Sequence, residues 1–290
     1  MIEPWPALQA ARAHDPATRV PFHVADAHAP PLHVGSVART HAAVLRRWPQ
    51  WLQVHDTGIT LHAAATARAD ALATMNAALR AEGLIVAWRD EPFPLFDCNG
   101  QELGVAMERA ATRFWGTLTL GAHCNGYVAD AHGRPAQLWI ARRAPTKATD
   151  PNRLDNLIGG GVPAGQSPRD TVVREGWEEA GLLPAQMQGL QRGRVLQLLR
   201  DIPEGLQREW IHVYDLALPR ETTPLNQDGE VAGLALHDIA AALALAGSSE
   251  MTVDAALVTL DFALRRRLFD APTHAALSAA AAGLFAGEAA

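Results

Sequence analysis

Cysteine is scarce in this chain, since Cys98 and Cys124 are the only two among 290 residues. So few cysteines indicate neither a disulfide-rich scaffold nor a structural zinc site. Neither cysteine has the partner pattern of a catalytic nucleophile, and no serine arrangement of that kind is present. A chain of this length can instead bury a large apolar core, and we expect two domains.

Long apolar runs and an excess of positive charge are also missing. No apolar run approaches the length of a membrane span, and the opening residues, Met-Ile-Glu-Pro-Trp-Pro, lack the layout of a signal peptide. The chain has 25 Lys and Arg against 31 Asp and Glu, a formal net charge of −6 and a pI near 6.0. This balance disfavours nucleic acid or an anionic membrane as a partner. We therefore expect a soluble, cytoplasmic protein that acts on a small molecule.

The most informative feature that is present is an acidic cluster formed by Glu175, Glu178 and Glu179. At about 3.6 residues per turn, these carboxylates share one face of a helix, within an arc of roughly 100°. Like charges at this spacing repel each other unless something neutralises them. Mg²⁺ or Mn²⁺ would do so, because both prefer carboxylate oxygens. The alternative is a solvated helix face, in which Arg174 simply pairs with Glu178.

The residues around the cluster predict a loop followed by a helix. The glycines at 159–161 allow unusual backbone conformations and the close approach of a ligand. Ser167 and Pro168 are typical of the first positions of a helix, and Gly181 is typical of its end. The face opposite the acids is expected to pack against a sheet through Val173, Trp177 and Ala180.

The register of these residues resembles the Nudix box. From Gly160 the sequence reads GGVPAGQSPRDTVVREGWEEAGL, whereas the Nudix pattern is Gly, five residues, Glu, seven residues, then Arg-Glu-apolar-x-Glu-Glu-x-Gly-apolar. Two positions depart from that pattern. Gln166 stands in place of the first Glu, which keeps hydrogen bonding but loses a charge. Gly176 replaces an apolar residue and should weaken the helix by up to about 1 kcal/mol relative to Ala.

Periodicity and turn residues predict an α/β protein in two parts. We expect a small α+β N-terminal domain over residues 1–112 and, over residues 113–290, the Nudix α/β/α sandwich with a mixed sheet and C-terminal helices. Helices are predicted at residues 35–48, 66–82, 235–246, 253–267 and 272–285. Strands are predicted at residues 52–54, 59–61, 85–88, 94–96, 118–128, 138–141, 195–199 and 210–218.

Further segments resemble one Nudix subgroup, which is related to the N-terminal region of fungal thiamine pyrophosphokinases. These segments are Lys147 and residues 138–143 (LWIARR), 154–157 (LDNL) and 226–231 (NQDGEV). Residues 21–26 (PFHVAD) and 88–91 (WRDE) resemble the amino-terminal domain of that subgroup. The resemblance implies hydrolysis of thiamine diphosphate, or of its oxidised (oxo or oxy) analogues, to the monophosphate and phosphate.

The same resemblance implies a metal site on the helix. Glu175 and Glu179 would be inner ligands of Mg²⁺ (or Mn²⁺), Glu178 would bind directly or through water, and the carbonyl of Gly160 would complete the shell. The metal would polarise phosphoryl oxygens and lower the pKa of a bound water. Arg174 would orient Glu175 rather than touch the substrate.

The general base and the substrate contacts are less well defined. Glu175, Glu178 and Glu230 are all candidates for the base, although Glu230 can equally be a plain loop carboxylate. His123 is expected to be a hydrogen-bonded core residue. Substrate contacts are expected from charged and aromatic residues outside the helix, with Arg143 and Lys147 on the terminal phosphate and Trp88, Arg89 and Glu91 on the organic group.

Three classes of function remain open. The leading one is a metal-dependent diphosphate hydrolase, with a nucleoside diphosphate derivative of the ADP-ribose or NADH type as the alternative substrate. The second is a non-hydrolytic enzyme such as an isomerase, for which no reactive-cysteine pattern is seen. The third is a non-catalytic sensor that binds a diphosphate, which Gln166 and Gly176 favour slightly. Whether the protein forms a homodimer is left open.

Overall fold

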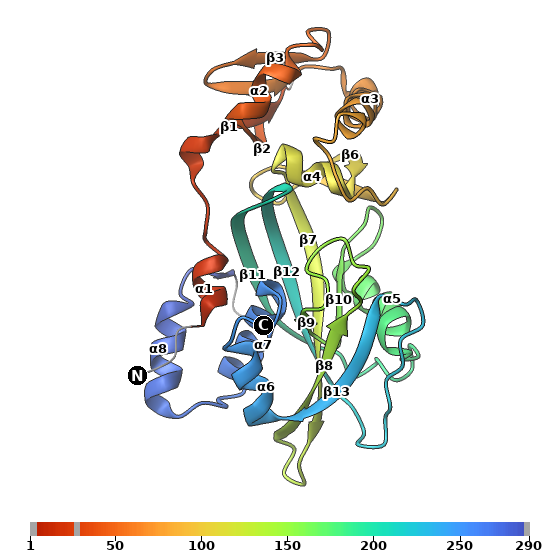
Figure 1. Cartoon of the computed structure of the whole chain (residues 1–290), viewed down its shortest axis with the longest axis vertical. Helices are drawn as coiled ribbons and strands as arrows, with labels where there is room; N and C mark the ends of the chain where they lie inside the picture. Colours follow the sequence, from red (N-terminus) through yellow and green to blue (C-terminus); the bar gives the residue numbers. More distant parts are fainter. Residues whose placement is uncertain (1–4, 26–29, 287–290) are drawn as a thin grey trace.

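The computed structural model describes residues 5–25 and 30–286, which form two parts stacked end to end (Figure 1). The first part contains a four-stranded sheet with the order β2-β1-β4-β3. The strands are β1 (Arg19–Val24), β2 (Leu32–Ala38), β3 (Leu52–His55) and β4 (Gly58–Leu61). The helices of this part are α2 (Arg39–Leu45) and α3 (Arg68–Ala81), with short 3-10 turns at Pro16–Thr18 and Ala65–Ala67.

A hairpin and a short helix connect this sheet to the rest of the molecule. The hairpin consists of β5 (Pro92–Phe96) and β6 (Glu102–Glu108), and α4 (Arg109–Trp115) follows it directly. Trp115 is fully buried against Phe22 of β1, with the ring centroids 4.7 Å apart. The first part therefore has its own apolar core, and α4 lies at the boundary with the second part.

The second part is built on an eight-stranded mixed sheet. Its main path is β13-β8-β7-β12-β11-β14, with β10 paired to β7 and β9 paired to β8; β7 and β12 run parallel. The strands are β7 (Leu118–Ala129), β8 (Pro135–Arg143), β9 (Leu154–Asp155), β10 (Ile158–Gly161), β11 (Gln191–Ile202), β12 (Gly205–Ala217), β13 (Val231–Asp238) and β14 (Phe285–Ala286).

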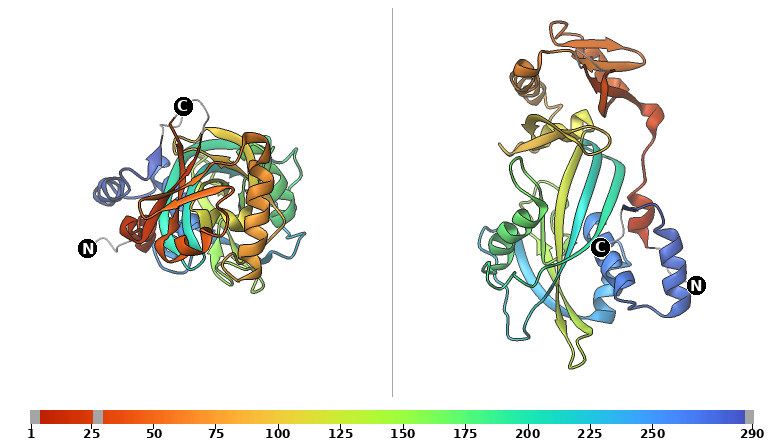
Figure 2. Two further views of the ribbon diagram at one scale, coloured as in Figure 1. Left: turned by 90° about the horizontal axis from the view of Figure 1, so that it is seen from above. Right: turned by 180° about the vertical axis from the view of Figure 1, so that it is seen from behind.

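Helices cover both faces of this sheet (Figures 1 and 2). One apolar cluster joins α5 (Pro168–Ala180) to β7, β10 and β12. Another cluster joins the opposite face to α6 (Ile239–Ala246), α7 (Val253–Arg265) and α8 (Ala271–Ala280). The predicted α/β/α sandwich with a mixed sheet is thus confirmed.

The first helix of the chain, α1 (Pro6–Ala10), packs on the second part rather than on the first. Trp5, Ala7 and Ala11 belong to the apolar cluster around α7, and the ring of Trp5 meets that of Phe269 edge to face. The chain then crosses to β1. The proposed range 1–112 for the first domain therefore includes a segment that stabilises the other domain.

Most of the predicted elements are present. The helices at 66–82 and 253–267 and the hairpin at 52–54 and 59–61 match α3, α7 and the β3–β4 pair. The expected helices at 35–48 and 235–246 are wrong in their first residues, because β2 and β13 occupy those residues and only α2 and α6 are helical. The strand expected at 85–88 is not formed. Asp26, part of one resembling segment, lies outside the described residues. No helix of the described chain is long and apolar enough to cross a membrane.

Candidate active site

The helix α5 carries the acidic cluster and begins and ends where the sequence predicts. Ser167 and Asp170 form a capping box, with Pro168 in the first turn, and Gly181 ends the helix with a left-handed φ of 65°. The predicted packing face is wrong in one respect, because Trp177 is 47% exposed. Gly176 is buried instead, where a Cβ would overlap with the end of Met187.

The glycines at 159–161 belong to strand β10 and not to a loop. None of them has a positive φ, so conformational freedom does not explain them. Close packing does explain them. A Cβ on Gly159 would lie 2.7 Å from the ring of His123, and one on Gly161 would lie 2.5 Å from Phe93. A Cβ on Gly160 would overlap with the carboxylate of Glu175. The acidic helix can therefore reach the strand only because residue 160 has no side chain.

The ladder between β10 and β7 determines which carbonyl faces the acids. Gly160 pairs with Ala122, and the N–H of Val162 donates to Leu120 at 2.8 Å, so even-numbered residues of β10 bond to β7. The N–H of Gly159 donates instead to Glu179 at 2.8 Å. In an antiparallel strand the N–H and C=O of one residue point to the same side. The expectation that the Gly160 carbonyl is the metal ligand is therefore corrected, because the carbonyl on the α5 side is that of Gly159.

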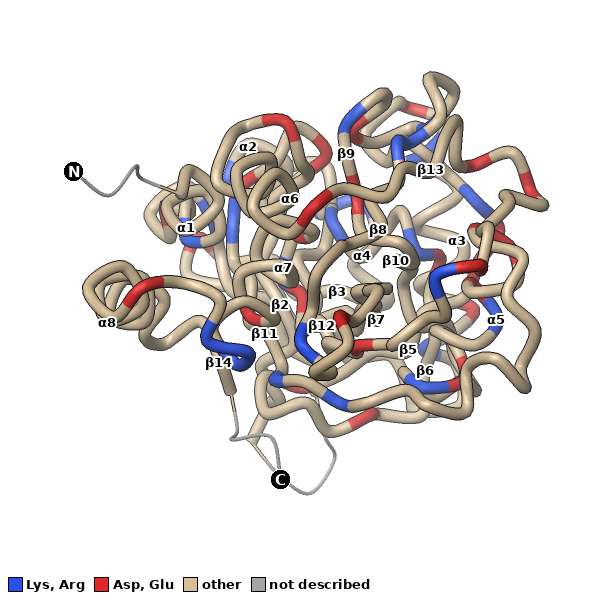
Figure 3. The backbone as a smooth tube through the Cα atoms, turned by 90° about the horizontal axis from the view of Figure 1, so that it is seen from below, with Lys and Arg blue, Asp and Glu red and all other residues tan. Residues whose placement is uncertain are grey.

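Arg174 holds two of the three carboxylates. Its guanidinium donates to Glu175 at 2.8 Å and to Glu178 at 2.6 Å. The side-chain oxygen of Gln166 accepts from Arg174 at 3.3 Å and from Thr171 at 3.2 Å. Gln166 thus provides the hydrogen bonding expected of the Glu it replaces. Acidic and basic positions are interspersed along α5 and the chain around it (Figure 3).

Burial makes the two inner carboxylates unfavourable as they stand. It raises the pKa of Glu175, which the charge of Arg174 partly offsets. Burial, followed by the nearby charge of Glu175, raises the pKa of Glu179 well above its usual value. In the described part of the chain, no three His, Cys, Asp or Glu side chains are grouped closely enough to hold a metal ion. Glu178 forms an ion pair with Arg174 at 2.6 Å.

The remaining chemistry fits a hard divalent cation. Glu175, Glu179 and the Gly159 carbonyl offer only oxygen donors. Burial, followed by acidic charge, raises the pKa of both carboxylates, with Glu178 acting on Glu175 and Glu175 acting on Glu179. Mg²⁺ and Mn²⁺ prefer such oxygens, and a bound cation would neutralise these charges.

The structure brings Lys147, Glu230 and Arg89 together beside the cluster. Glu230 forms ion pairs with Lys147 and, at 3.3 Å, with Arg89 of the first part. Lys147 is largely buried, which lowers its pKa, and the charge of Glu179 opposes that effect. Glu230 is thus close to the acids, but each of its oxygens already faces a cation.

Arg143 lies on the same side but is held by other groups. It donates to the carboxylate of Asp155 at 2.7 Å and to the backbone oxygens of Thr149 and Asp150. Two of the residues expected on the organic group are also engaged. The ring of Trp88 is covered by Arg80, with 4.6 Å from the guanidinium carbon to the ring centroid, and Glu91 accepts from Arg109 at 2.9 Å.

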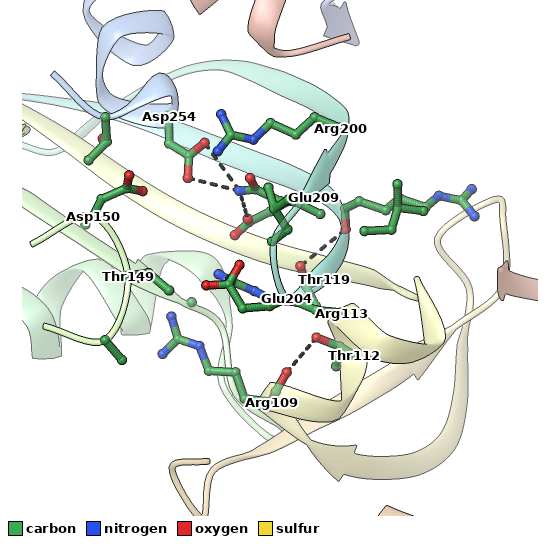
Figure 4. A pocket seen from close by; sticks show the side chains of 18 of the residues that line it. Arg109, Thr112, Arg113, Thr119, Thr149, Asp150, Arg200, Glu204, Glu209 and Asp254 are labelled. Atoms are coloured by element: carbon green, nitrogen blue, oxygen red, sulfur yellow. Dashed lines mark hydrogen bonds and ion pairs between the residues drawn. The ribbon is translucent and has the colours of Figure 1, made fainter. Parts of the chain in front are cut away.

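A polar cavity of about 260 Å³ lies beside the glycine strand, between the two parts of the molecule (Figure 4). Residues 159–161 and Arg143 line one end, together with Arg109 of α4. The other end is acidic, with Glu204, Glu209 and Asp254 pointing inwards. The glutamates of α5 do not line this cavity. They lie behind β10, so the Gly159–Gly161 backbone separates them from it.

At the acidic end of the cavity Glu204 pairs with Arg113 at 3.8 Å, whereas Glu209 and Asp254 are held mainly by Gln207, with the charge of Arg200 acting on Asp254. Gln207 donates to Glu209 at 2.8 Å and to Asp254 at 3.1 and 3.3 Å, and neither acid forms an ion pair within the described residues. Burial, followed by the charge of Glu209, raises the pKa of Asp254. His123 also lines the cavity, and its Nδ1 atom forms a hydrogen bond with the side-chain oxygen of Asn156 at 3.0 Å. It is therefore hydrogen-bonded in the core, as expected.

Sequence reasoning did not find Arg109, Asp155, Glu209 or Asp254. Arg109 belongs to the site through a contact between the two parts, and Asp155 belongs to it through its ion pair with Arg143. Glu209 and Asp254 lie on β12 and α7, far from the glycine strand in sequence. Asp155 alone had a signal, since it stands within the resembling segment 154–157.

Comparison with known proteins agrees with this geometry. Residues 122–254 match the NUDIX domain, and residues 7–119 match a domain of unknown function (DUF4743). Nudix hydrolase 20, chloroplastic, of Arabidopsis thaliana is 35% identical over 201 residues, which cover 68% of this chain and 53% of that protein. Nudix hydrolase 24, chloroplastic, of the same plant is 32% identical over 69% of this chain and 55% of its own.

A crystal structure of a Deinococcus radiodurans protein aligns with 59% of this chain and 99% of its own, with 23% sequence identity and a TM-score of 0.44. The chain spans about half the length of the curated relatives it matches. The described cluster, with its glycine strand and capped acidic helix, falls wholly within the matched residues 122–254. The chain therefore joins a NUDIX domain to an N-terminal DUF4743 domain.

Proposed function

We propose that this protein hydrolyses the diphosphate bond of a small organic diphosphate with the help of Mg²⁺ or Mn²⁺. One observation carries the proposal: the carboxylates of Glu175 and Glu179 both lie against the glycine strand, at Gly160 and at the Gly159 N–H, and burial raises the pKa of each. A diphosphate repels an attacking water, so its hydrolysis needs positive charge and a positioned nucleophile. Nudix hydrolases among the similar proteins support the same reading.

The residues that would hold the metal are Glu175, Glu179 and the carbonyl of Gly159, with Glu178 joining if it leaves Arg174. When bound, such a cation polarises phosphoryl oxygens and lowers the pKa of a coordinated water. Arg174 acts through Glu175, because its 2.8 Å hydrogen bond fixes the carboxylate orientation. Arg174 is thus a positioning residue.

The base remains a choice among Glu175, Glu178 and Glu230. Both carboxylate oxygens of Glu230 are already in ion pairs, with Arg89 and with Lys147, so they are less available to a water than a free carboxylate. Among the described residues Glu178 pairs with Arg174, and its side chain is 35% exposed, so it can reach water. Lys147 and Arg143 remain proposed contacts for the terminal phosphate, since both lie at the edge of the acidic cluster.

For the organic group we propose thiamine diphosphate or its oxidised analogues, with a nucleoside diphosphate derivative as the alternative. The acidic end of the cavity, at Glu209 and Asp254, supports a group that is positively charged or rich in hydrogen-bond donors. Trp88 and Glu91 are less suited than expected, because Arg80 and Arg109 already occupy them. Arg89 lines a separate hollow of about 260 Å³ together with Lys147 and Glu230.

The test is phosphate release from a panel of diphosphates in the presence of Mg²⁺ or Mn²⁺. The panel contains thiamine diphosphate, its oxidised analogues, ADP-ribose, NADH and nucleoside diphosphates, compared by kcat/KM. We expect the thiamine compounds to give the highest values and Glu179→Gln to lower phosphate release strongly. Preference for ADP-ribose or NADH would remove the thiamine assignment, and no release from any compound would leave binding as a sensor.

A pair of variants tests the proposed role of the acidic end. Glu209→Gln and Asp254→Asn should raise KM for substrates with a cationic or amine-bearing group and leave KM for other diphosphates unchanged. Equal effects on all substrates would show that these acids only support the fold.

A further inference from the structure

Among the contacts between the domain of unknown function and the NUDIX site, the junction of β6 and α4 brings a cation to the glycine strand. Arg109 is the first residue of α4, and its side chain turns away from the core of its own domain into the polar cavity (Figure 4). The guanidinium carbon lies 3.4 Å from where a Cβ on Gly161 would be and 5.2 Å from the ring centroid of Phe93. A cation of the first domain therefore lies against the glycine strand on the cavity side.

The guanidinium of Arg109 has donors to spare. Its only side-chain hydrogen bond to a described residue runs from Nη1 to Glu91, at 2.9 Å. An arginine has five N–H donors arranged for bidentate contact with phosphate oxygens. The side chain is 33% exposed and lines the cavity, so its unused donors are available to a ligand there. Its positive charge also reaches Glu175, where it offsets a part of the rise in pKa that burial causes.

The neighbouring residue, Glu108, fixes the backbone around this arginine. Its carboxylate accepts the N–H groups of Ala110, Arg89 and Glu91, at 3.2, 2.9 and 3.1 Å. The N–H of Arg109 in turn donates to the carbonyl of Glu91 at 2.8 Å. One carboxylate thus caps α4 and ties it to the segment that carries Arg89.

The same segment stores backbone strain. Ala87 and Asp90 both have a φ of 58°, which non-glycine residues rarely adopt. Strained residues persist only where surrounding contacts hold them, and they gather at functional sites. Glu108 supplies such contacts here, on both sides of Asp90.

We infer that the first domain completes the hydrolase site by supplying Arg109 as a phosphate-binding residue, with Glu108 as the residue that positions it. This inference rests on the proposed function, since it assumes that a diphosphate enters the cavity beside the glycine strand. Glu175 approaches this strand at Gly160 and the guanidinium of Arg109 approaches it at Gly161, so the acidic helix and the first domain meet at the same three residues. The domain of unknown function is then a part of the site and not an independent module.

Binding of inorganic pyrophosphate with Mg²⁺, measured by calorimetry, tests this inference without requiring any turnover. Loss of a hydrogen bond to a charged group weakens binding by about 10- to 100-fold. We expect Arg109→Gln to weaken pyrophosphate binding by about that factor, and Arg109→Lys to restore part of it. Arg46→Gln is the control and should leave pyrophosphate binding unchanged. Arg46 lies in the same domain, and its ion pair among the described residues is with the exposed Asp56.

Two further measurements separate binding from structure. Glu108→Gln should raise KM for the diphosphate substrate and weaken pyrophosphate binding, with kcat less affected. If Arg109 only braces the domain boundary against Glu91, Arg109→Gln will lower Tm and leave pyrophosphate binding unchanged, which overturns the inference. Absence of hydrolysis by the wild-type protein would overturn the proposed function, whereas the binding result would still decide the role of Arg109.

Discussion

Two groups of buried carboxylates in the same domain differ in how their charge is compensated. Asp215 of β12 and Asp261 of α7 are fully buried, yet arginines surround them. Arg265 pairs with both at 2.7 Å, Arg194 pairs with Asp261 at 2.5 Å, and Arg266 pairs with Asp215 at 3.5 Å. Three cations thus neutralise two anions, and the group needs nothing from outside.

The glutamates of α5 lack this compensation. Arg174 is shared between Glu175 and Glu178, and Glu179 receives a single hydrogen bond from the backbone N–H of Gly159. Burial raises the pKa values of both inner glutamates. By contrast, the hydrogen bonds and charges of Asp215 and Asp261 raise the pKa of Arg265, although its burial opposes this. Burial of acids alone does not indicate a functional site. Burial in which one arginine is shared between two of three acids, next to a glycine strand, does.

The largest difference between the two groups should appear in Glu179→Gln. We expect kcat/KM for the diphosphate substrate to fall by about 10²- to 10³-fold, the size typical of losing one group that stabilises transition-state charge. We also expect Tm in the presence of a chelator to rise, because a buried, uncompensated charge is removed. Phosphate release and thermal unfolding check the two effects. A fall in both activity and Tm would place Glu179 with the structural acids.

The reverse result is expected for Asp261→Asn. The free energy of unfolding should fall by about 3–5 kcal/mol, since Arg194 and Arg265 would lose a buried partner. Activity per folded molecule should stay unchanged. Urea unfolding measures the loss, and Asp56→Asn is a matched control because the Asp56 side chain is 96% exposed. Unchanged stability would mean that the arginine network is dispensable.

The sequence predicts the functional acids far better than the structural ones, because the signals of α5 are local. Ser167, Pro168 and Gly181 set the ends of the helix, and the spacing of the three glutamates sets their common face. The network of Asp215 and Asp261 joins residues up to 67 positions apart, and no local pattern connects them.

The errors of sequence reasoning have the same origin. Trp177 was expected in the core, but the packing of α5 is decided by Met187, which fills the space left by Gly176. Two segments that we expected at the starts of helices form strands instead, because they pair with β1 and β8. These segments are residues 35–38 and 235–238. Arg109 enters the site from a different domain, which no motif of the NUDIX region can reveal.

A smaller effect is expected when the approach of the acidic helix to β10 is disturbed. In Gly160→Ala the new methyl group overlaps with the Glu175 carboxylate, which has to move, so kcat/KM should fall by about 10- to 100-fold with little change in Tm. Gly233→Ala is the control, because a Cβ there meets nothing within 4 Å and its φ is not positive. If Gly160→Ala keeps full activity, Glu175 does not act from its observed position.

The smallest effect concerns a buried titratable group that belongs to neither cluster. Burial, followed by the charge of Arg192, lowers the pKa of His212 to about 4. The unfolded chain has a histidine pKa of about 6.5, so between these values it binds a proton that the folded protein does not. Stability from His212 is therefore complete above about pH 6.5 and is lost as the pH falls towards 4, by about 1.4 kcal/mol at pH 5.5.

Replacing this histidine separates its contribution from those of the acids. His212→Gln should abolish this part of the stability loss between pH 7.5 and pH 5.5, as measured by urea unfolding at both values. Any loss that remains in the variant comes from other titratable groups. An identical loss in the variant and the wild type would contradict the lowered pKa of His212 in the folded protein.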